Sequence, residues 1–152
     1  MKPLAAPAPI AAAVAADRSA VLALLASCGL PTDDVDPALA HFFVARAAGA
    51  LVGCVALEPR GDGLALFRSL AVAEDFRGRR IAHRLFEAAG RHAITLSLTE
   101  LWLLTTTAES LFATWGFARV PRQAAPAVVQ ASAEFASLCP SSAVVMRLGL
   151  GG

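Results

Sequence analysis

Apolar residues follow two different periods on either side of residue 75. An alternating run that includes Leu64, Leu66, Leu70 and Val72 predicts a strand over 64–72. It breaks at an acidic pair, and a basic cluster of three arginines and a glycine follows at residues 77–80. After this cluster the apolar residues recur at helical spacing, which predicts a long helix over about 79–97; they are Ala82, Leu85, Phe86, Ala89 and Ala93. The pattern therefore predicts a strand, a tight turn and a helix that begins with arginines.

The N-terminal part predicts one strand and one helix. Residues 10–14 are expected to form the strand. Asp17 is a candidate N-cap for a helix over 17–28, which Gly29 and Pro31 would end. The acidic stretch over 32–40 is expected to hold a short helix or a loop.

The remaining pattern predicts a hairpin and then alternating strands and helices. Two runs of strand-forming residues between 41 and 59 flank a turn at 48–50, and Pro59 with the glycine-rich residues 61–63 is expected to end the second run. After the long helix we expect a buried strand at 101–107, a helix at 108–115 that Gly116 ends, a strand from Phe117, short helices in 121–140 and a last strand at 144–148.

This order predicts an α/β fold with a mixed, mostly antiparallel sheet of six or seven strands flanked by helices. The length of 152 residues predicts a single domain spanning residues 1–152. With 57% hydrophobic and 16% charged residues, the chain has ample apolar surface for one core, so a disordered chain is excluded.

Composition also limits location and partners. No uninterrupted apolar stretch reaches the length of a membrane span, and a net charge near +1 disfavours broad nucleic-acid binding. Residues 1–19 are rich in alanine and compatible with a secretory signal, but three prolines interrupt them, which favours the strand. Three cysteines without a C-x-x-C pair fit buried thiols in a reducing cytoplasm.

Scattered histidines predict no metal site: they are His41, His83 and His92. We expect His83 to form a surface pair with Glu87 one helical turn away. The lone Cys139 is expected to be a small buried hydrophobic residue.

Three arginines at the start of a helix are electrostatically unusual. The partial positive charge of a helix N-terminus disfavours cations there, unless an anion binds between them. Free backbone N–H groups and forked guanidinium donors together favour a phosphate. The alternative is a solvated basic helix start without a ligand.

In this predicted strand, turn and helix the chain resembles the GNAT superfamily of N-acetyltransferases. The signature of that family is an apolar strand, then R/Q-x-x-G-x-G/A opening a long helix, and later a Gly-Phe pair. Here Leu70, Ala71 and Val72 end the strand, the signature falls on residues 77–82, and Gly116-Phe117 form the pair. The resemblance extends over nearly the whole chain, with two departures. Arg80 replaces the first glycine of the signature, and Phe112 stands where the family has a tyrosine.

The resemblance implies acetyl-CoA as cosubstrate, without a metal. Backbone N–H groups at the helix start would bind the pyrophosphate, and the end of the strand would pair with the pantetheine arm. The cofactor-binding residues implied are Leu70, Ala71, Val72, Arg77, Gly78, Arg79, Arg80, Ile81, Ala82 and Phe112.

The expected catalytic residues are Glu58, Leu70 and Thr107. The backbone N–H near Leu70 would stabilise the oxyanion of the thioester carbonyl. Glu58 would assist deprotonation of the amine through water, unless it is only an exposed carboxylate at a strand end. Because Phe112 cannot donate a proton, the thiolate would take one from a threonine of 105–107, from Ser69 or from water, or would leave unprotonated.

A narrower resemblance is to the GNAT branch associated with arsenic resistance, and it rests on the residues of 103–108 and on parts of 121–143, including Pro121-Arg122 and Leu138-Cys139-Pro140. It implies an amino-acid-like acceptor, including an arsenical or phosphinic glutamate analogue. The expected substrate-binding residues are Arg46, Arg68, Ser69, Thr105 and Thr106. Each arginine lies in a predicted strand, where a cation needs an anionic partner; that partner is either a substrate carboxylate or an internal acid, Glu58 or Asp62. The threonines also suit a strand by propensity alone.

We therefore expect a cytoplasmic acetyl-CoA-dependent N-acetyltransferase that acts on a small-molecule amine and binds neither nucleic acid nor membrane. A homodimer is compatible with the apolar last strand. The alternative is a non-catalytic acyl-CoA-binding sensor or regulatory module on the same fold, which the missing tyrosine favours.

Overall fold

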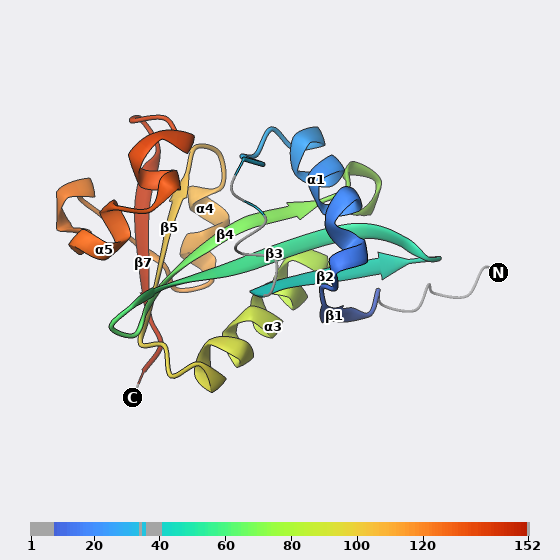
Figure 1. Ribbon diagram of the computed structural model, residues 1–152, viewed down its shortest axis with the longest axis horizontal. Helices are drawn as coiled ribbons and strands as arrows, with labels where there is room; N and C mark the ends of the chain where they lie inside the picture. The colour runs from blue at the N-terminus through green and yellow to red at the C-terminus, as the bar shows by residue number, and fades with distance from the viewer. Residues whose placement is uncertain (1–7, 34, 36–40, 152) are drawn as a thin grey trace. The chain divides into compact units, whose positions relative to one another are not determined.

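The computed structural model describes residues 8–33, 35 and 41–151. Seven strands form one mixed sheet in the order β1-β2-β3-β4-β5-β7-β6, and helices flank it (Figure 1). The predicted α/β class, strand number and flanking helices are confirmed. The expectation of one domain stays a prediction.

The chain divides into two compact units that share the long hairpin of β3 and β4. The first unit comprises Met1–Val55 and Ser69–Ala89, and the second comprises Ala56–Arg68 and Gly90–Gly152. Strand β3 spans Ala50–Gly61 and β4 spans Leu64–Val72, so each strand belongs to one unit at one end and to the other unit at the other end.

In the first unit, a short helix and the start of a long helix accompany two antiparallel strands. Strand β1 pairs with β2, and Ile10 lies opposite Ala45. The predicted turn at 48–50 is present, and Ala48 and Gly49 both adopt positive φ values. The elements are β1 (Ile10–Ala12), η1 (Ala15–Asp17), α1 (Arg18–Ser27), β2 (Phe42–Ala47), η3 (Glu74–Phe76) and α3 (Ile81–Thr95), whose last turns belong to the second unit.

Gly53 of β3 brings the start of α3 close to the sheet. A Cβ atom at this position would lie 3.1 Å from side-chain carbons of Ile81 and Leu85, and 3.4 Å from the carbonyl oxygen of Ala71. Because only a glycine leaves this space, the residue determines how closely the helix packs.

In the second unit, β5 (Glu100–Thr105) continues the sheet. It runs parallel to β4, with Leu64 opposite Glu100, and antiparallel to β7 (Val144–Gly149). Strand β6 (Ala118–Val120) pairs with the outer side of β7. The connections are α4 (Glu109–Thr114), η4 (Arg122–Ala124), α5 (Ala127–Gln130) and η5 (Glu134–Leu138).

The segment between β6 and β7 covers one face of these strands. Val129 of α5 and Phe135 of η5 pack with Trp102 and Val145 of the sheet in one buried cluster. Figure 1 shows α5 and its neighbouring turns beside β7 and β5. This apolar contact fixes the connection to its own unit, because the burial of such side chains is a main source of stability.

Several local predictions need correction. Asp17 does not cap α1 with its side chain but accepts a hydrogen bond from the Val14 N–H at 2.9 Å. Pro59 lies inside β3 and does not end it. The long helix begins at Ile81, two residues after the predicted start. Only Cys54 of the three thiols is buried; Cys28 and Cys139 are partly exposed. The expected helix or loop over 32–40 falls largely outside the described residues.

Within the described part of the chain, none of the helices is long and apolar enough to cross a membrane. The same residues contain no group of three or more histidine, cysteine, aspartate or glutamate side chains that could hold a metal ion.

Candidate functional site

The connection from β4 to α3 in the first unit has an irregular backbone. After the strand comes η3, and Arg77 returns to an extended conformation. Gly78 has a φ of +79° and Arg80 a φ of +62°, so two of the four residues before the helix are left-handed. A Cβ at Gly78 would meet no atom within 4 Å, so the loop is open around this residue.

The helical hydrogen-bond ladder begins at the N–H of Arg84, which donates to the carbonyl of Arg80 at 3.1 Å. The N–H groups of Ile81 and Ala82 precede this bond, and in an α-helix such groups have no partner within the helix. The N–H of Arg77 differs, since it donates to Glu74 at 3.3 Å. The predicted anion-binding amides are thus those from Gly78 onward.

The three arginines of the loop make different contacts. The Nε of Arg77 donates to the carbonyl of Val72 at 3.0 Å, and its Nη2 lies 3.7 Å from the Sγ of Cys28. The guanidinium carbon of Arg79 lies 4.9 Å from the centre of the Phe76 ring. All three residues are exposed. Arg77 therefore stabilises the end of β4 through this hydrogen bond, while Arg79 and Arg80 add positive charge near the N-terminus of α3.

The end of β4 contains a distortion that the pattern of apolar residues did not reveal. Ser69 is buried and has a φ of +59°, which is unusual for a residue other than glycine. Its carbonyl accepts a hydrogen bond from the thiol of Cys54 at 3.3 Å. Leu70, Ala71 and Val72 follow this irregular residue, so the predicted pantetheine-binding stretch begins directly after it.

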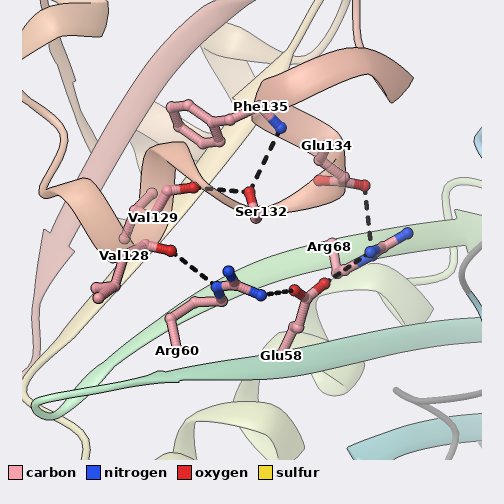
Figure 2. A network of polar contacts seen from close by, with 8 residues as sticks. All are labelled: Glu58, Arg60, Arg68, Val128, Val129, Ser132, Glu134 and Phe135. Carbon is pink, nitrogen blue, oxygen red and sulfur yellow. Dashed lines mark hydrogen bonds and ion pairs between the residues drawn. The ribbon is translucent and has the colours of Figure 1, made fainter.

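In the second unit, the described residues include a network of two arginines and two glutamates, of which Arg68 and Glu134 are buried and Glu58 and Arg60 are partly exposed. Figure 2 shows Glu58 of β3 between Arg60 and Arg68. Arg68 Nη1 lies 2.7 Å from Glu58 Oε1, and its Nε lies 3.3 Å from Glu134 Oε2. The side chains of Arg68 and Glu134 are only 1% and 6% exposed.

Arg60 connects this network to the segment between β6 and β7. Its Nη1 donates to Glu58 Oε2 at 2.9 Å, and its Nε donates to the carbonyl of Val128 at 2.9 Å (Figure 2). Two guanidinium groups thus balance two carboxylates, as the buried charges of Arg68 and Glu134 require. The network ties α5 and η5 to β3 and β4.

These contacts concern Arg46 and Arg68, the two residues predicted to bind a carboxylate of the substrate. Arg68 has internal acidic partners, one of which, Glu58, was the expected alternative. Arg46 pairs with Asp17, an acid that was not considered. The hydrogen bond from Arg46 holds the pKa of Asp17 below its ordinary value. Both oxygens of Glu58 accept hydrogen bonds from arginines.

The three threonines at the end of β5 differ in environment. Thr105 is buried, and its hydroxyl accepts a hydrogen bond from the N–H of Ala108 at 3.0 Å. Thr106 and Thr107 follow the strand and are exposed. Thr105 therefore helps to shape the turn into α4, and the other two threonines lie at the surface.

Phe112, the residue at the family's tyrosine position, lies in an aromatic cluster. Its ring centre is 6.0 Å from Phe67, 5.6 Å from Trp115 and 5.8 Å from Phe117, and each pair makes an edge-to-face contact. Only 7% of the residue is exposed. The ring serves to pack α4 and brings no ionisable group.

Comparison with known proteins identifies related sequences and folds. The model of the acetyltransferase (GNAT) domain family matches residues 38–119, more than half of the chain. No curated protein matches the sequence.

Several solved structures share the fold. A Mycobacterium tuberculosis protein in complex with CoA is 22% identical, with a TM-score of 0.79 over 93% of this chain and 98% of that one. An acetyltransferase of the GNAT family from Staphylococcus aureus is 13% identical, with a TM-score of 0.78 over 94% of this chain and 99% of that one.

An N-acetylglutamate synthase from Neisseria gonorrhoeae, complexed with coenzyme A and N-acetyl-glutamate, is 19% identical, with a TM-score of 0.83. The match covers 97% of this chain but 36% of the synthase, so the chain spans about a third of that enzyme. At these identities the likeness is one of fold.

Proposed function

Because the chain belongs to the GNAT acetyltransferase family and is an acetyl-CoA-dependent N-acetyltransferase, we propose that its acceptor is the amine of a small amino-acid-like molecule. The observation that supports acetyl-CoA binding is the loop before α3. Its backbone is open around Gly78, the N–H groups of Ile81 and Ala82 precede the first hydrogen bond of the helix, and Arg79 and Arg80 are exposed. Such a helix start favours a diphosphate.

The proposed reaction follows from the chemistry of a thioester. The amine nitrogen attacks the acetyl carbonyl carbon, a C–N bond forms, and the C–S bond to CoA breaks. The N–H of Leu70 would stabilise the oxyanion, a contact that contributes about 3 kcal/mol in other acyl transfers. The amine proton would pass through water to Glu58.

The leaving thiolate has no tyrosine to protonate it, because Phe112 occupies that position. We assign the proton donor to the exposed Thr107 or to water, and an unprotonated departure is also feasible since a thiol pKa lies near 8.5. Ser69, Thr105 and Thr106 complete the proposed substrate contacts. Arg46 and Arg68 can serve as carboxylate anchors only if an acceptor competes with their internal acids.

The amino-acid acceptor has two supports. The first is the resemblance of residues 103–108 and of parts of 121–143 to the arsenic-resistance branch, for which an arsenical or phosphinic glutamate analogue is the proposed substrate. The second is that one protein of this fold is an N-acetylglutamate synthase complexed with N-acetyl-glutamate.

A turnover assay tests the proposal. Purified protein, acetyl-CoA and a panel of amines are incubated, and free CoA thiol is measured with a chromogenic disulfide. We expect turnover with glutamate-like analogues and none with polyamines or aminoglycosides. Tight CoA binding by calorimetry without turnover on any amine would favour the sensor alternative instead.

Two glycine variants test the cofactor loop. Gly78→Ala forces a residue with a Cβ into a left-handed conformation, so we expect CoA affinity to fall about five- to thirty-fold, equivalent to about 1–2 kcal/mol. Gly61→Ala imposes the same strain in the β3–β4 turn, where φ is +94° and a Cβ also meets no atom within 4 Å. Equal losses of CoA affinity in both variants, measured by calorimetry, would contradict the assignment.

A further inference from the structure

Arg77, the first arginine of the loop before α3, forms its hydrogen bonds with the protein itself. Its backbone N–H donates to the carbonyl of Glu74 at 3.3 Å, and its Nε donates to the carbonyl of Val72 at 3.0 Å. Its Nη2 lies 3.7 Å from the Sγ of Cys28, which is only a weak acceptor. Within the described ranges of the chain this guanidinium makes no ion pair, so its positive charge has no acidic partner there.

The carbonyl of Val72 points away from β3. The peptide that joins Val72 to Ala73 shows this, because the N–H of Ala73 donates to the carbonyl of Val52 on β3 at 2.8 Å. In a trans peptide the N–H and the C=O point in opposite directions, and the described residues contain no cis peptide bond. The Nε of Arg77 therefore meets the Val72 carbonyl on the side of β4 that β3 leaves open.

CoA needs the same carbonyl, because the pantetheine arm is expected to pair with the end of β4 on this open side. A carbonyl oxygen has two lone pairs, and two donors already approach it: the Nε of Arg77 and the thiol of Cys28, whose Sγ lies 3.9 Å away. A thiol is a weak donor, so Arg77 is the stronger of the two. A pantetheine N–H therefore competes with Arg77 for this oxygen.

We propose that Arg77 is a positioning residue that exchanges partners when CoA binds. Its guanidinium moves from the Val72 carbonyl to the diphosphate, and an N–H of the pantetheine arm takes its place on the carbonyl. This inference rests on the proposed CoA site at the end of β4 and in the loop before α3. The diphosphate is the better partner for Arg77, since a hydrogen bond between two charged groups is stronger than one to a neutral carbonyl.

The local structure allows this exchange without a change of fold. Arg77 is exposed, so its side chain is not fixed by packing. Gly78 follows it directly, and a Cβ there would meet no atom within 4 Å. The N–H groups of Ile81 and Ala82 precede the first helical hydrogen bond, which Arg84 donates. A diphosphate on these amides therefore binds only a few residues from Arg77 along the chain.

The exchange makes the two parts of CoA assist each other. Pantetheine alone must displace Arg77 without offering the guanidinium a new partner, so its affinity is lowered by the fraction of molecules in which the carbonyl is covered. A diphosphate removes this cost, because it attracts Arg77 away from the carbonyl. Binding of either part therefore strengthens binding of the other, and this coupling is reciprocal.

Binding experiments with CoA, pantetheine and inorganic pyrophosphate test the exchange without an acceptor or turnover. Arg77→Met keeps the hydrocarbon stem and removes the donors and the charge. By calorimetry and amide chemical shifts, we expect it to weaken CoA binding about five-fold or more and to strengthen pantetheine binding about two- to five-fold. Saturating pyrophosphate should strengthen pantetheine binding in the wild type and not in Arg77→Met. A residue that only stabilised β4 would weaken both ligands when replaced.

Two further variants separate the position of the arginine from its charge. Arg79→Met removes a charge from the same loop, but this guanidinium lies over the Phe76 ring, so the variant should weaken CoA binding without strengthening pantetheine binding. Arg91→Met, at an exposed position of α3, should change neither affinity. Arg77→Lys keeps the charge and should weaken CoA binding less than Arg77→Met does.

The outcomes distinguish the exchange from the CoA site itself. Suppose that the wild type binds CoA, but that Arg77→Met weakens pantetheine binding or leaves it unchanged, or that pyrophosphate affects pantetheine equally in both proteins. The exchange is then wrong and the CoA site stands. If the wild type does not bind CoA, the proposed site is wrong and the exchange with it.

Discussion

Arg68 lies on β4 with 1% of its side chain exposed, and it is tolerated there because Glu58 and Glu134 both lie within ion-pair distance. The pattern of the sequence predicted that a cation in this strand needs an acidic partner, and Glu58 was one of the candidates. Glu134 could not be predicted, because it comes from a distant segment that only the folded chain brings to β4. The contact of Arg60 with the carbonyl of Val128 likewise joins residues that are distant in the sequence.

Glu58→Gln separates a chemical role from a structural one. If Glu58 accepts the amine proton through water, the substitution should lower kcat about a hundred-fold or more and remove the acidic limb of the pH–rate profile. Measurement of the rate of CoA release over a range of pH tests this role of Glu58.

Glu134→Gln is the matched control, since Glu134 is also a partner of Arg68 and has no proposed chemical role. Both variants should lower the melting temperature, because each leaves a buried arginine with one acid fewer. If kcat falls equally in the two variants, the network only positions the strands, and Glu58 is not the base.

At the scale of elements, Gly53 determines how α3 meets β3. The sequence predicted both elements from the periods of their apolar residues, because those periods directly reflect the buried faces. It did not predict their close approach, since a single glycine in a strand has several explanations. The same limit applies to Ser69, whose positive φ depends on its surroundings and not on its own preference.

Gly53→Ala should lower the free energy of unfolding by about 1–3 kcal/mol, because its Cβ would lie 3.1 Å from carbons of Ile81 and Leu85. Gly90→Ala, in α3, is the control. There a Cβ meets no atom within 4 Å, so alanine should raise the stability by about 0.5–1 kcal/mol. Urea denaturation measures both, and a loss of stability in both variants would contradict the packing argument.

At the scale of the molecule, the order of strands and helices was predictable from the sequence, and the fold class is confirmed. The loop before α3 was predictable as well, because its glycine and arginines are adjacent in the chain. The ion pair of Arg68 with Glu134 was not, since it depends on how the segment between β6 and β7 packs on the sheet.

The stability of the whole chain should depend on pH through Asp17. Its folded-state pKa lies below the ordinary value, chiefly because of the hydrogen bond from Arg46. A depressed pKa stabilises the fold above the ordinary carboxyl pKa of about 4, and this contribution is lost as the pH falls through the folded-state value.

Asp17→Asn should therefore be less stable than the wild type at pH 7, by about 1.5–3 kcal/mol, the usual contribution of a hydrogen bond to a charged group. The difference should shrink near pH 3. Asp62→Asn, in the exposed β3–β4 turn, removes the same charge as a control. Urea denaturation at the two pH values would contradict the assignment if the Asp17 difference did not change.

The burial of Cys54 makes this residue a natural reporter of local opening. Burial raises the pKa of its thiol to about 12, so almost no thiolate forms while the first unit stays closed. Alkylation of Cys54 therefore requires that β3 separates from its surroundings, and the labelling rate at neutral pH measures how often this occurs. Mass spectrometry of a Cys28→Ser, Cys139→Ser double variant would record that opening frequency without a fluorophore or an engineered probe.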